Sequence, residues 1–239
     1  MFFLRSSHIC IGFILFLTSC NILKNSPKYG FVEGYYRSHL FHKKDKKIYV
    51  VPTEDSIKIY SAKSLKKGYV DTSKILKIAF PQNEKPLAFK NYLFRKKTLD
   101  IDAITIPLKF RPAVDHLPGQ AFGGFSSAVY LGYRSDFYHL SYSQTPLKVF
   151  KRDINHYGYS FGLFTGIGTA NINENNTDND VIIAYDGVVN ISGINLSIGV
   201  QKFRIGLAAG FDHLFGKNRK HWVYQGKPWI GFSFGLNLH

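Results

Sequence analysis

A histidine and a serine two residues apart are the side chains whose types and spacing best fit catalysis. His139 and Ser141 lie in the segment 138–143, where apolar and polar residues alternate. Because side chains on a strand alternate between its two faces, both would lie on the same face. A histidine base beside a serine hydroxyl is the minimum arrangement for acyl transfer. The pair is a candidate catalytic site. The alternative is that both are ordinary polar side chains of a strand.

A second group of residues has part of the spacing of a calcium loop. The segment 171–180 is rich in Asn and Asp, and Asn176, Asp178 and Asp180 follow one another at intervals of two residues. The calcium pattern then fails, because its glycine position holds a valine and its final glutamate position holds a glycine. We interpret this segment as a solvated surface loop and expect no metal site.

Motifs for nucleotide cofactors and for a catalytic zinc ion are missing from the sequence. Gly166-Ile167-Gly168 lacks the third glycine and the helix of a dinucleotide-binding fingerprint. The chain also has no P-loop and no H-E-x-x-H sequence. We expect no cofactor.

Alternating segments fill the C-terminal half of the chain and predict seven strands. A tight turn is expected at Ser135-Asp136 and a hairpin at Gln201-Lys202. An eighth strand is expected from the N-terminal half or from residues 181–189. The seven predicted strands are 99–111, 125–134, 138–143, 157–167, 194–200, 203–212 and 229–239.

These predicted strands have one apolar face and one face of small or polar residues. A face rich in Gly and Ser suits the crowded interior of a small barrel better than the core of a sandwich. Alternation does not tell which face meets lipid, so a soluble barrel or sandwich with its apolar face inward stays an alternative. In the first strand one face is expected to hold Ile104, Ile106, Leu108 and Phe110.

Charged and aromatic residues add two further expectations. Charges on the small-residue face should form ion pairs in the interior, because an unpaired interior charge is costly; they are Arg134, Arg204 and Asp212. Aromatic residues near strand ends should form girdles at the membrane surfaces; they are Tyr133, Tyr157, Trp222 and Trp229.

The first residues of the chain predict export. An apolar run over 9–17 follows the single charge of Arg5 and is too short to span a bilayer. It ends in Leu17-Thr18-Ser19-Cys20, which resembles the lipobox of bacterial lipoprotein precursors. That resemblance implies cleavage before Cys20 and lipidation of its thiol. The alternative is an ordinary secretory signal, and both interpretations export the chain.

Charge and cysteine content limit the partners. The formal net charge is +15, with a surplus of 11 basic residues in 20–120 and of 3 in 121–239. An exported chain does not meet the genome, so nucleic acid is not expected as a partner. Lipid phosphates, lipopolysaccharide or other anionic envelope polymers are candidates, beside a merely solvated basic surface. The two cysteines, Cys10 and Cys20, lie in or next to the signal, which excludes a disulfide framework.

The segment 229–239, at the end of the chain, resembles the closing strand of a bacterial outer-membrane β-barrel. Together with the signal, it makes the chain similar to the small outer-membrane β-barrel proteins of Gram-negative cells. The resemblance implies an all-β, antiparallel up-and-down barrel of about eight strands in the outer membrane. The expected organisation is a signal peptide over 1–19, a basic, irregular β extension over 20–98 and the barrel over 99–239.

Three functions follow as hypotheses. The first is a non-enzymatic envelope protein, lipid-anchored if Cys20 is modified, with a structural or surface-contact role. The second is a lipid-modifying acyl hydrolase or transferase, since some barrels of this class use a serine and a histidine on the barrel wall, the roles implied for Ser141 and His139. The third is a periplasm-facing lipoprotein barrel that binds an apolar ligand. Ligand, physiological role and oligomeric state are left open by the sequence.

Overall fold

The computed structural model describes residues 30–40, 46–61, 70, 72, 75–79, 91–200 and 203–236. The predicted signal and Cys20 lie outside the described residues. Within them the fold is all-β and every strand pairing is antiparallel. No helix among them is long and apolar enough to cross a membrane. The strands are β1 (Gly34–Ser38), β2 (Lys46–Pro52), β3 (Ser56–Ser61), β4 (Ile75–Ala79), β5 (Tyr92–Arg111), β6 (Gln120–Gly123), β7 (Ser126–Gln144), β8 (Phe150–Ile172), β9 (Tyr185–Val200), β10 (Phe203–Leu214) and β11 (Pro228–Leu236).

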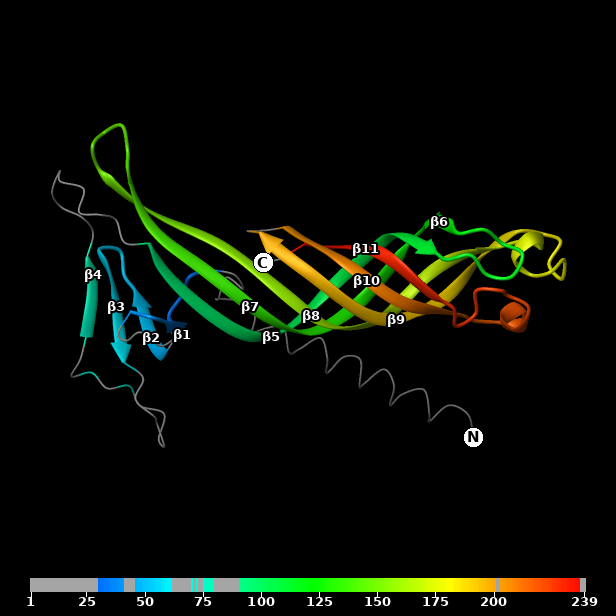
Figure 1. The fold of residues 1–239 in the computed structure, drawn as a ribbon, viewed down its shortest axis with the longest axis horizontal. Helices are drawn as coiled ribbons and strands as arrows, with labels where there is room; N and C mark the ends of the chain where they lie inside the picture. Colours follow the sequence, from blue (N-terminus) through cyan, green and yellow to red (C-terminus); the bar gives the residue numbers. More distant parts are fainter. Residues whose placement is uncertain are drawn as a thin grey trace, which may run out of the picture.

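Six of these strands close into a ring. The order β11-β10-β9-β8-β7-β5 is completed by pairing of β11 with β5, so no free edge remains along the paired part (Figure 1). Two short 3-10 helices, η2 (Glu174–Asn176) and η3 (Lys217–Lys220), lie in the loops at one end. The expectation of about eight strands is wrong: the sheet has eleven strands, of which six form the ring.

The strand count differs because β7 is continuous. The predicted turn at Ser135-Asp136 lies in the middle of β7, where Ser135 pairs with Lys97 of β5 and with Tyr159 of β8. The segments expected as two strands on either side of this turn are therefore one. Residues 181–189 are one of the two places where an eighth strand is expected, and of these 185–189 belong to β9.

The strands of the ring are strongly staggered. Stepping across paired residues from Thr98 on β5 returns to β5 between Thr105 and Leu108, well beyond the starting point, by way of Arg134, Ser160, Ser197, Gly206 and Ser233. A closed sheet with such a stagger must have strands tilted to its axis. The tilt is plain in Figure 1, where the ring strands run obliquely across the long axis.

Three of the ring strands extend beyond the ring at one end. The first part of β5, the last part of β7 and the first part of β8 continue as a sheet to which β1, β2, β3 and β4 are added in that order. We call this sheet the extension. It has its own apolar core, formed by Tyr36, Ile48, Val50, Ile57, Ile59, Ile78, Phe94, Tyr138, Leu140 and Tyr142.

Apolar residues of the ring strands point outward, and small or polar residues point inward. On β10, Phe203, Ile205 and Leu207 are 69, 56 and 54% exposed, whereas Arg204 and Ala208 between and beside them are buried. The same alternation holds on β8, as the sequence predicted, and in the described part of β11, where Phe234 is 45% exposed and Ser233 is buried. The apolar face of this sheet is therefore its outer surface.

One strand changes its face part-way along. Ile104 and Ile106 of β5 are buried inside the ring, but Leu108 and Phe110 are exposed outside it. The expectation that all four share a face is wrong. Pro107 has no N–H to donate to a neighbouring strand, and the pairing of β5 with β11 shifts register at this level. The irregularity turns Lys109 and Arg111 into the interior.

Candidate functional site

The interior of the ring holds three clusters of charged side chains. The first surrounds Asp212 of β10. Its carboxylate forms ion pairs with two basic residues of β5, at 2.9 Å to Lys109 Nζ and at 2.7 Å to Arg111 Nη2. The indole N–H of Trp229 donates to the same carboxylate at 2.7 Å. Since β11 lies between β10 and β5 in the ring, these contacts join strands that are not neighbours.

Aromatic rings enclose the Arg111 guanidinium at this end of the ring. Its Cζ lies 4.9 Å from the ring centre of Phe122, 5.2 Å from Trp222 and 4.9 Å from Tyr224. Trp222 and Tyr224 come from the connection between β10 and β11 and are buried. The expectation that Trp222 and Trp229 form membrane girdles is wrong, because both pack inside and cover a buried cation.

The second cluster surrounds Arg204 of β10. Its Nη1 lies 2.9 Å from Asp100 and 3.2 Å from Asp102, both on β5. Its Nε donates to Ser197 Oγ at 2.7 Å, and Nη2 donates to Ser160. The guanidinium thus contacts three other strands across the interior.

The third cluster lies nearest the extension. Asp136 of β7 accepts a hydrogen bond from Arg134 Nε at 2.7 Å and lies 2.8 Å from His156 Nε2 on β8. The imidazole stacks on Tyr138, with ring centres 4.6 Å apart. All four side chains are buried.

Opposite charges balance over the described interior. The three clusters contain four carboxylates, those of Asp100, Asp102, Asp136 and Asp212, and four basic groups, those of Lys109, Arg111, Arg134 and Arg204. His156 is the histidine that contacts the carboxylate of Asp136 in the third cluster. Removing one partner of a buried ion pair leaves a desolvated charge without compensation. Each cluster therefore stabilises the ring only when all of its charged partners are present.

Little free space remains around these clusters. Apolar residues that include Ile106, Phe164 and Trp229 pack together between the clusters around Arg204 and Asp212. A Cβ placed on the inward Gly132 would lie 2.0 Å from the hydroxyl oxygen of Tyr130, a side chain that packs on Arg204. The described interior is a packed polar and apolar core, which is the arrangement typical of the narrowest closed sheets.

The catalytic candidates do not form a pair. His139 and Ser141 lie in the part of β7 that belongs to the extension. The imidazole Nε2 of His139 is 3.1 Å from the hydroxyl oxygen of Tyr157, and the imidazole also stacks on the Tyr157 ring. Among the described residues no hydrogen bond joins His139 to Ser141. The geometry assembles no acyl-transfer site from these two side chains.

The residues with partial calcium spacing make contacts within their loop and with two other loops. Asn176 ends η2 and exchanges hydrogen bonds with Asn173. Asp178 lies 3.8 Å from His116, and Asp180 contacts His221. The described part of the chain contains no cluster of three or more His, Cys, Asp or Glu side chains placed to hold a metal ion.

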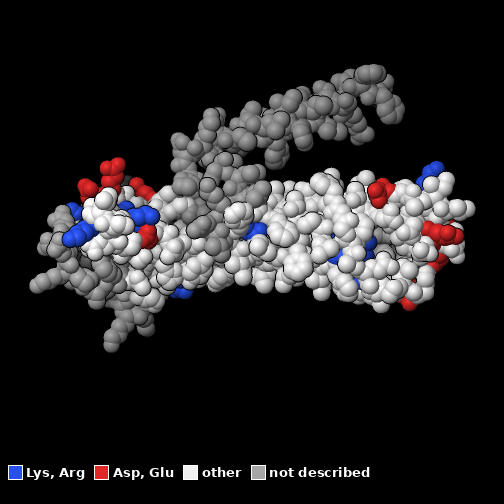
Figure 2. All heavy atoms as spheres, turned by 90° about the horizontal axis from the view of Figure 1, so that it is seen from above, with Lys and Arg blue, Asp and Glu red and all other residues white. Residues whose placement is uncertain are grey.

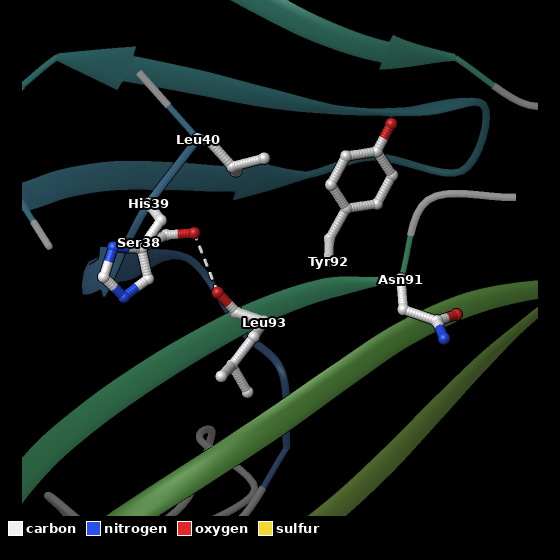
Figure 3. Close-up of a pocket in the computed structure, with 6 residues that line it drawn as sticks. All are labelled: Ser38, His39, Leu40, Asn91, Tyr92 and Leu93. Carbon is white, nitrogen blue, oxygen red and sulfur yellow. Dashed lines mark hydrogen bonds between the residues drawn. The ribbon is translucent and has the colours of Figure 1, made fainter. Parts of the chain in front are cut away.

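A pocket opens between the end of β1 and the start of β5. It is lined by Ser38, His39, Leu40, Asn91, Tyr92 and Leu93 (Figure 3). The Ser38 hydroxyl donates to the Leu93 carbonyl at 2.8 Å, so it ties β1 to β5. Among the residues that line the pocket, no basic side chain forms a hydrogen bond with the Ser38 hydroxyl, so they do not form a catalytic arrangement.

Sequence reasoning found only part of the charged interior. Arg134, Arg204 and Asp212 were expected on the inward face, and all three are buried there with partners. Asp100 and Asp102 were missed, although their alternation with Leu99 and Ile101 was a usable signal. Lys109 and Arg111 were not predictable from parity, because the face changes after Ile106. Comparison of the chain with protein-family models, with curated proteins and with solved structures found no match.

Proposed function

We propose that the chain is an integral membrane protein whose six-stranded ring crosses the outer membrane of a Gram-negative cell as a small β-barrel. The observation that carries the proposal is the polarity of the ring. Its charged groups are buried inside, and its large apolar side chains are exposed outside. A water-soluble fold has the opposite arrangement.

The outer apolar surface forms a belt around all six strands. Lone exposed apolar residues are ordinary, but a contiguous belt is far larger than the patches of soluble monomers. The belt consists of Leu99, Ile101, Leu108, Phe110, Val129, Leu131, Tyr133, Tyr157, Tyr159, Phe161, Leu163, Ile167, Val188, Ile194, Leu196, Ile198, Phe203, Ile205, Leu207, Phe211, Ile230, Phe232 and Phe234. Figure 2 agrees, since charged atoms gather mainly toward the two ends of the face it shows.

The height of the belt suits a membrane. On β10 its outward residues extend from Phe203 to Phe211. At about 3.3 Å per residue and a tilt of about 40°, this stretch covers roughly 20 Å along the membrane normal. Outer-membrane barrels have an apolar band of about 25 Å. Tyr133, Tyr157 and Tyr159 are exposed where the belt meets the extension, as residues of an interfacial girdle are.

The connections favour one orientation. The links 112–125, 173–184 and 215–227 lie at the end of the ring opposite the extension. The β9–β10 link is short, and the β7–β8 link is a short turn at the tip of the extension. Outer-membrane barrels keep short turns in the periplasm and longer loops outside. We therefore place the extension in the periplasm and the three long links outside the cell.

The packed interior favours a role without transport. Inside the described ring the charges are paired, and a Cβ added to Gly132 or Gly206 would lie 2.0 or 2.5 Å from the hydroxyl of Tyr130 or Ser233, so there is little space for a solute. The proposed function is therefore a non-enzymatic envelope protein with a structural or surface-contact role, and Cys20 is its predicted lipid anchor. No observation favours the hydrolase or the ligand-binding alternative over this one.

Membrane fractionation tests the proposal. The chain expressed in a Gram-negative host should stay in the outer-membrane fraction after carbonate extraction. Its unheated form should migrate differently from its boiled form in a denaturing gel, because a closed sheet resists detergent until it is heated. A carbonate-soluble protein with one mobility would contradict the proposal. Cys20→Ser should abolish labelling by a palmitate analogue without changing the gel behaviour, which separates the anchor from the barrel.

A further inference from the structure

Four basic residues stand where the apolar belt meets the extension, on the outer face of the sheet. We call them the basic rim: Arg37 of β1, Lys47 of β2, and Arg95 and Lys97 of β5. Their neighbours Tyr36, Ile48 and Phe94 point to the opposite face, into the apolar core of the extension. Arg37, Lys47 and Lys97 are exposed, and Arg95 is half-buried.

Three members of the rim oppose one another directly across neighbouring strands. Arg37 pairs with Arg95 on one side and with Lys47 on the other. Directly opposed side chains on one face lie about 5 Å apart at Cβ, and like charges at this distance destabilise a sheet. No carboxylate among the described residues forms an ion pair with Arg37, Lys47 or Lys97. Arg37 and Lys47 face each other across neighbouring strands, and this arrangement is favourable when an anion from outside the chain lies over the two cations.

The rim continues the outward face of the belt without a gap. On β5, Lys97 is followed at the same parity by Leu99 and Ile101, which are 69 and 60% exposed. The Lys97 ammonium also lies 5.8 Å from the ring centre of Tyr133, a belt residue. Lys97 is the next outward residue on β5 beyond the belt. If the belt spans the bilayer, a cation at this position lies at the depth of the lipid phosphates.

Aromatic rings lie among the cations of the rim on the outer face. The Lys47 ammonium lies 4.2 Å from the centre of the Tyr35 ring, and Tyr35 packs edge-on against Tyr49. In the same row, Arg95 is paired with Phe137, whose ring stacks on Tyr157 of the proposed girdle. Aromatic residues mixed with lysine and arginine are typical of the interface between hydrocarbon and water.

We propose that the basic rim binds the phosphate groups of anionic phospholipids in the leaflet next to the extension. The inference rests on the proposed membrane-spanning function and adds a lipid class to it. The ligand is a glycerophospholipid with a net negative head group, such as phosphatidylglycerol. The rim is continuous with the belt, which favours lipid as the ligand. A soluble polyanion or an acidic protein could bind cations anywhere on the surface and would not require them to lie next to the belt.

Binding of fluorescent phosphatidylglycerol in mixed micelles tests the proposal. The full chain, purified in a neutral detergent, should bind this lipid in preference to fluorescent phosphatidylcholine. The variant Arg37→Gln/Lys97→Gln should lose affinity for phosphatidylglycerol by about five-fold per cation at low salt. The matched control Lys58→Gln/Lys77→Gln removes the same charge from an opposed, exposed pair on β3 and β4, farther from the belt. It should bind as the unchanged chain does.

Each other outcome overturns the proposal. Equal loss in the control would show a diffuse charge effect, and no loss in the rim variant would show that these cations do not bind lipid. Competition by dextran sulfate that exceeds competition by phosphatidylglycerol would identify a soluble polyanion as the ligand. Heat-modifiable mobility of the same samples keeps the two proposals apart. If mobility still shifts on heating but lipid preference is absent, only the lipid site fails.

Discussion

Arg204 on β10 and Asp100 on β5 form an ion pair of 2.9 Å across the interior of the ring, although β11 separates their strands. Both side chains are about 1% exposed. The pair is possible because the inward positions around it are small, including Gly206 and Ser197. Long charged side chains thus cross the ring where the opposite wall leaves room for them.

Loss of Arg204 should strongly destabilise the fold. Arg204→Met removes the cation that pairs with the buried Asp100 and the partly buried Asp102, and loss of one partner of a buried ion pair typically costs about 3–5 kcal/mol. Urea unfolding followed by tryptophan fluorescence should show this loss. Adding Asp100→Asn and Asp102→Asn should restore part of the stability, because no unpaired charge then remains. Lys58→Met at an exposed position should change stability by no more than about 0.5 kcal/mol. Equal stability of Arg204→Met and Lys58→Met would contradict the interior network.

Position should decide the effect of a charge on the outer surface. Leu207→Arg lies in the belt and should cost about 2–4 kcal/mol near mid-membrane and block assembly. Leu147→Arg makes the same chemical change in the β7–β8 link, where Leu147 is 85% exposed. It should be tolerated. The yield of heat-modifiable protein in outer membranes measures both, and equal yields would argue against a lipid-facing belt.

The inward Gly162 should accept no side chain. Its added Cβ would meet the Leu131 carbonyl oxygen at 2.2 Å and the Gly132 Cα at 2.3 Å, and both are backbone atoms that cannot move aside. We expect Gly162→Ala to lower stability by at least about 1–3 kcal/mol, the usual cost of overpacking. Gly123→Ala is the control, since its nearest atom is 3.9 Å away. Urea midpoints that are the same for both variants would show that β7 and β8 leave room for a side chain at this position.

The extension should carry a tyrosine that resists ionisation. Burial raises the pKa of Tyr36 to about 12, while its hydroxyl donates to the Val32 carbonyl. The folded state keeps the proton better than the unfolded chain, whose tyrosines titrate near pH 10. The resulting stability, up to roughly 2–3 kcal/mol, is complete below pH 10 and is lost as the pH rises toward 12. Absorbance at 295 nm should lose a late titration step in Tyr36→Phe, and an unchanged curve would contradict this burial.

The sequence predicted alternation well and closure poorly. Local parity was enough to place Tyr157 and Phe161 on one face of β8 and Ser160 on the other. It could not tell which face is outside, because that depends on the pairing of β11 with β5. Ser135 and Asp136 have the composition of a turn, yet they pair on both sides within β7. Tertiary pairing outweighs turn propensity there.

The candidate site was harder to predict, since its partners come from distant strands. Arg204 and Asp100 are far apart in sequence, and only the stagger of the ring brings them together. Lys109 and Arg111 point into the ring because the inward face of β5 changes at Pro107. A regular alternation pattern in the sequence cannot predict this change. His139 and Ser141 share a strand, but Tyr157 of the next strand takes the imidazole. Spacing along one strand says little about the contacts made across strands.

Quenching of tryptophan by brominated lipid tests the membrane-spanning ring most directly. Leu207→Trp places a probe on the belt, and Leu147→Trp places the same probe in the β7–β8 link. Each variant is reconstituted in bilayers with bromine on the acyl chains and compared with the unchanged chain, whose two tryptophans are buried inside. We predict strong quenching of the added fluorescence at position 207 and little at position 147. Added fluorescence at 207 that bromine leaves unquenched, while the chain is folded and bound to the bilayer, would contradict the lipid-facing ring.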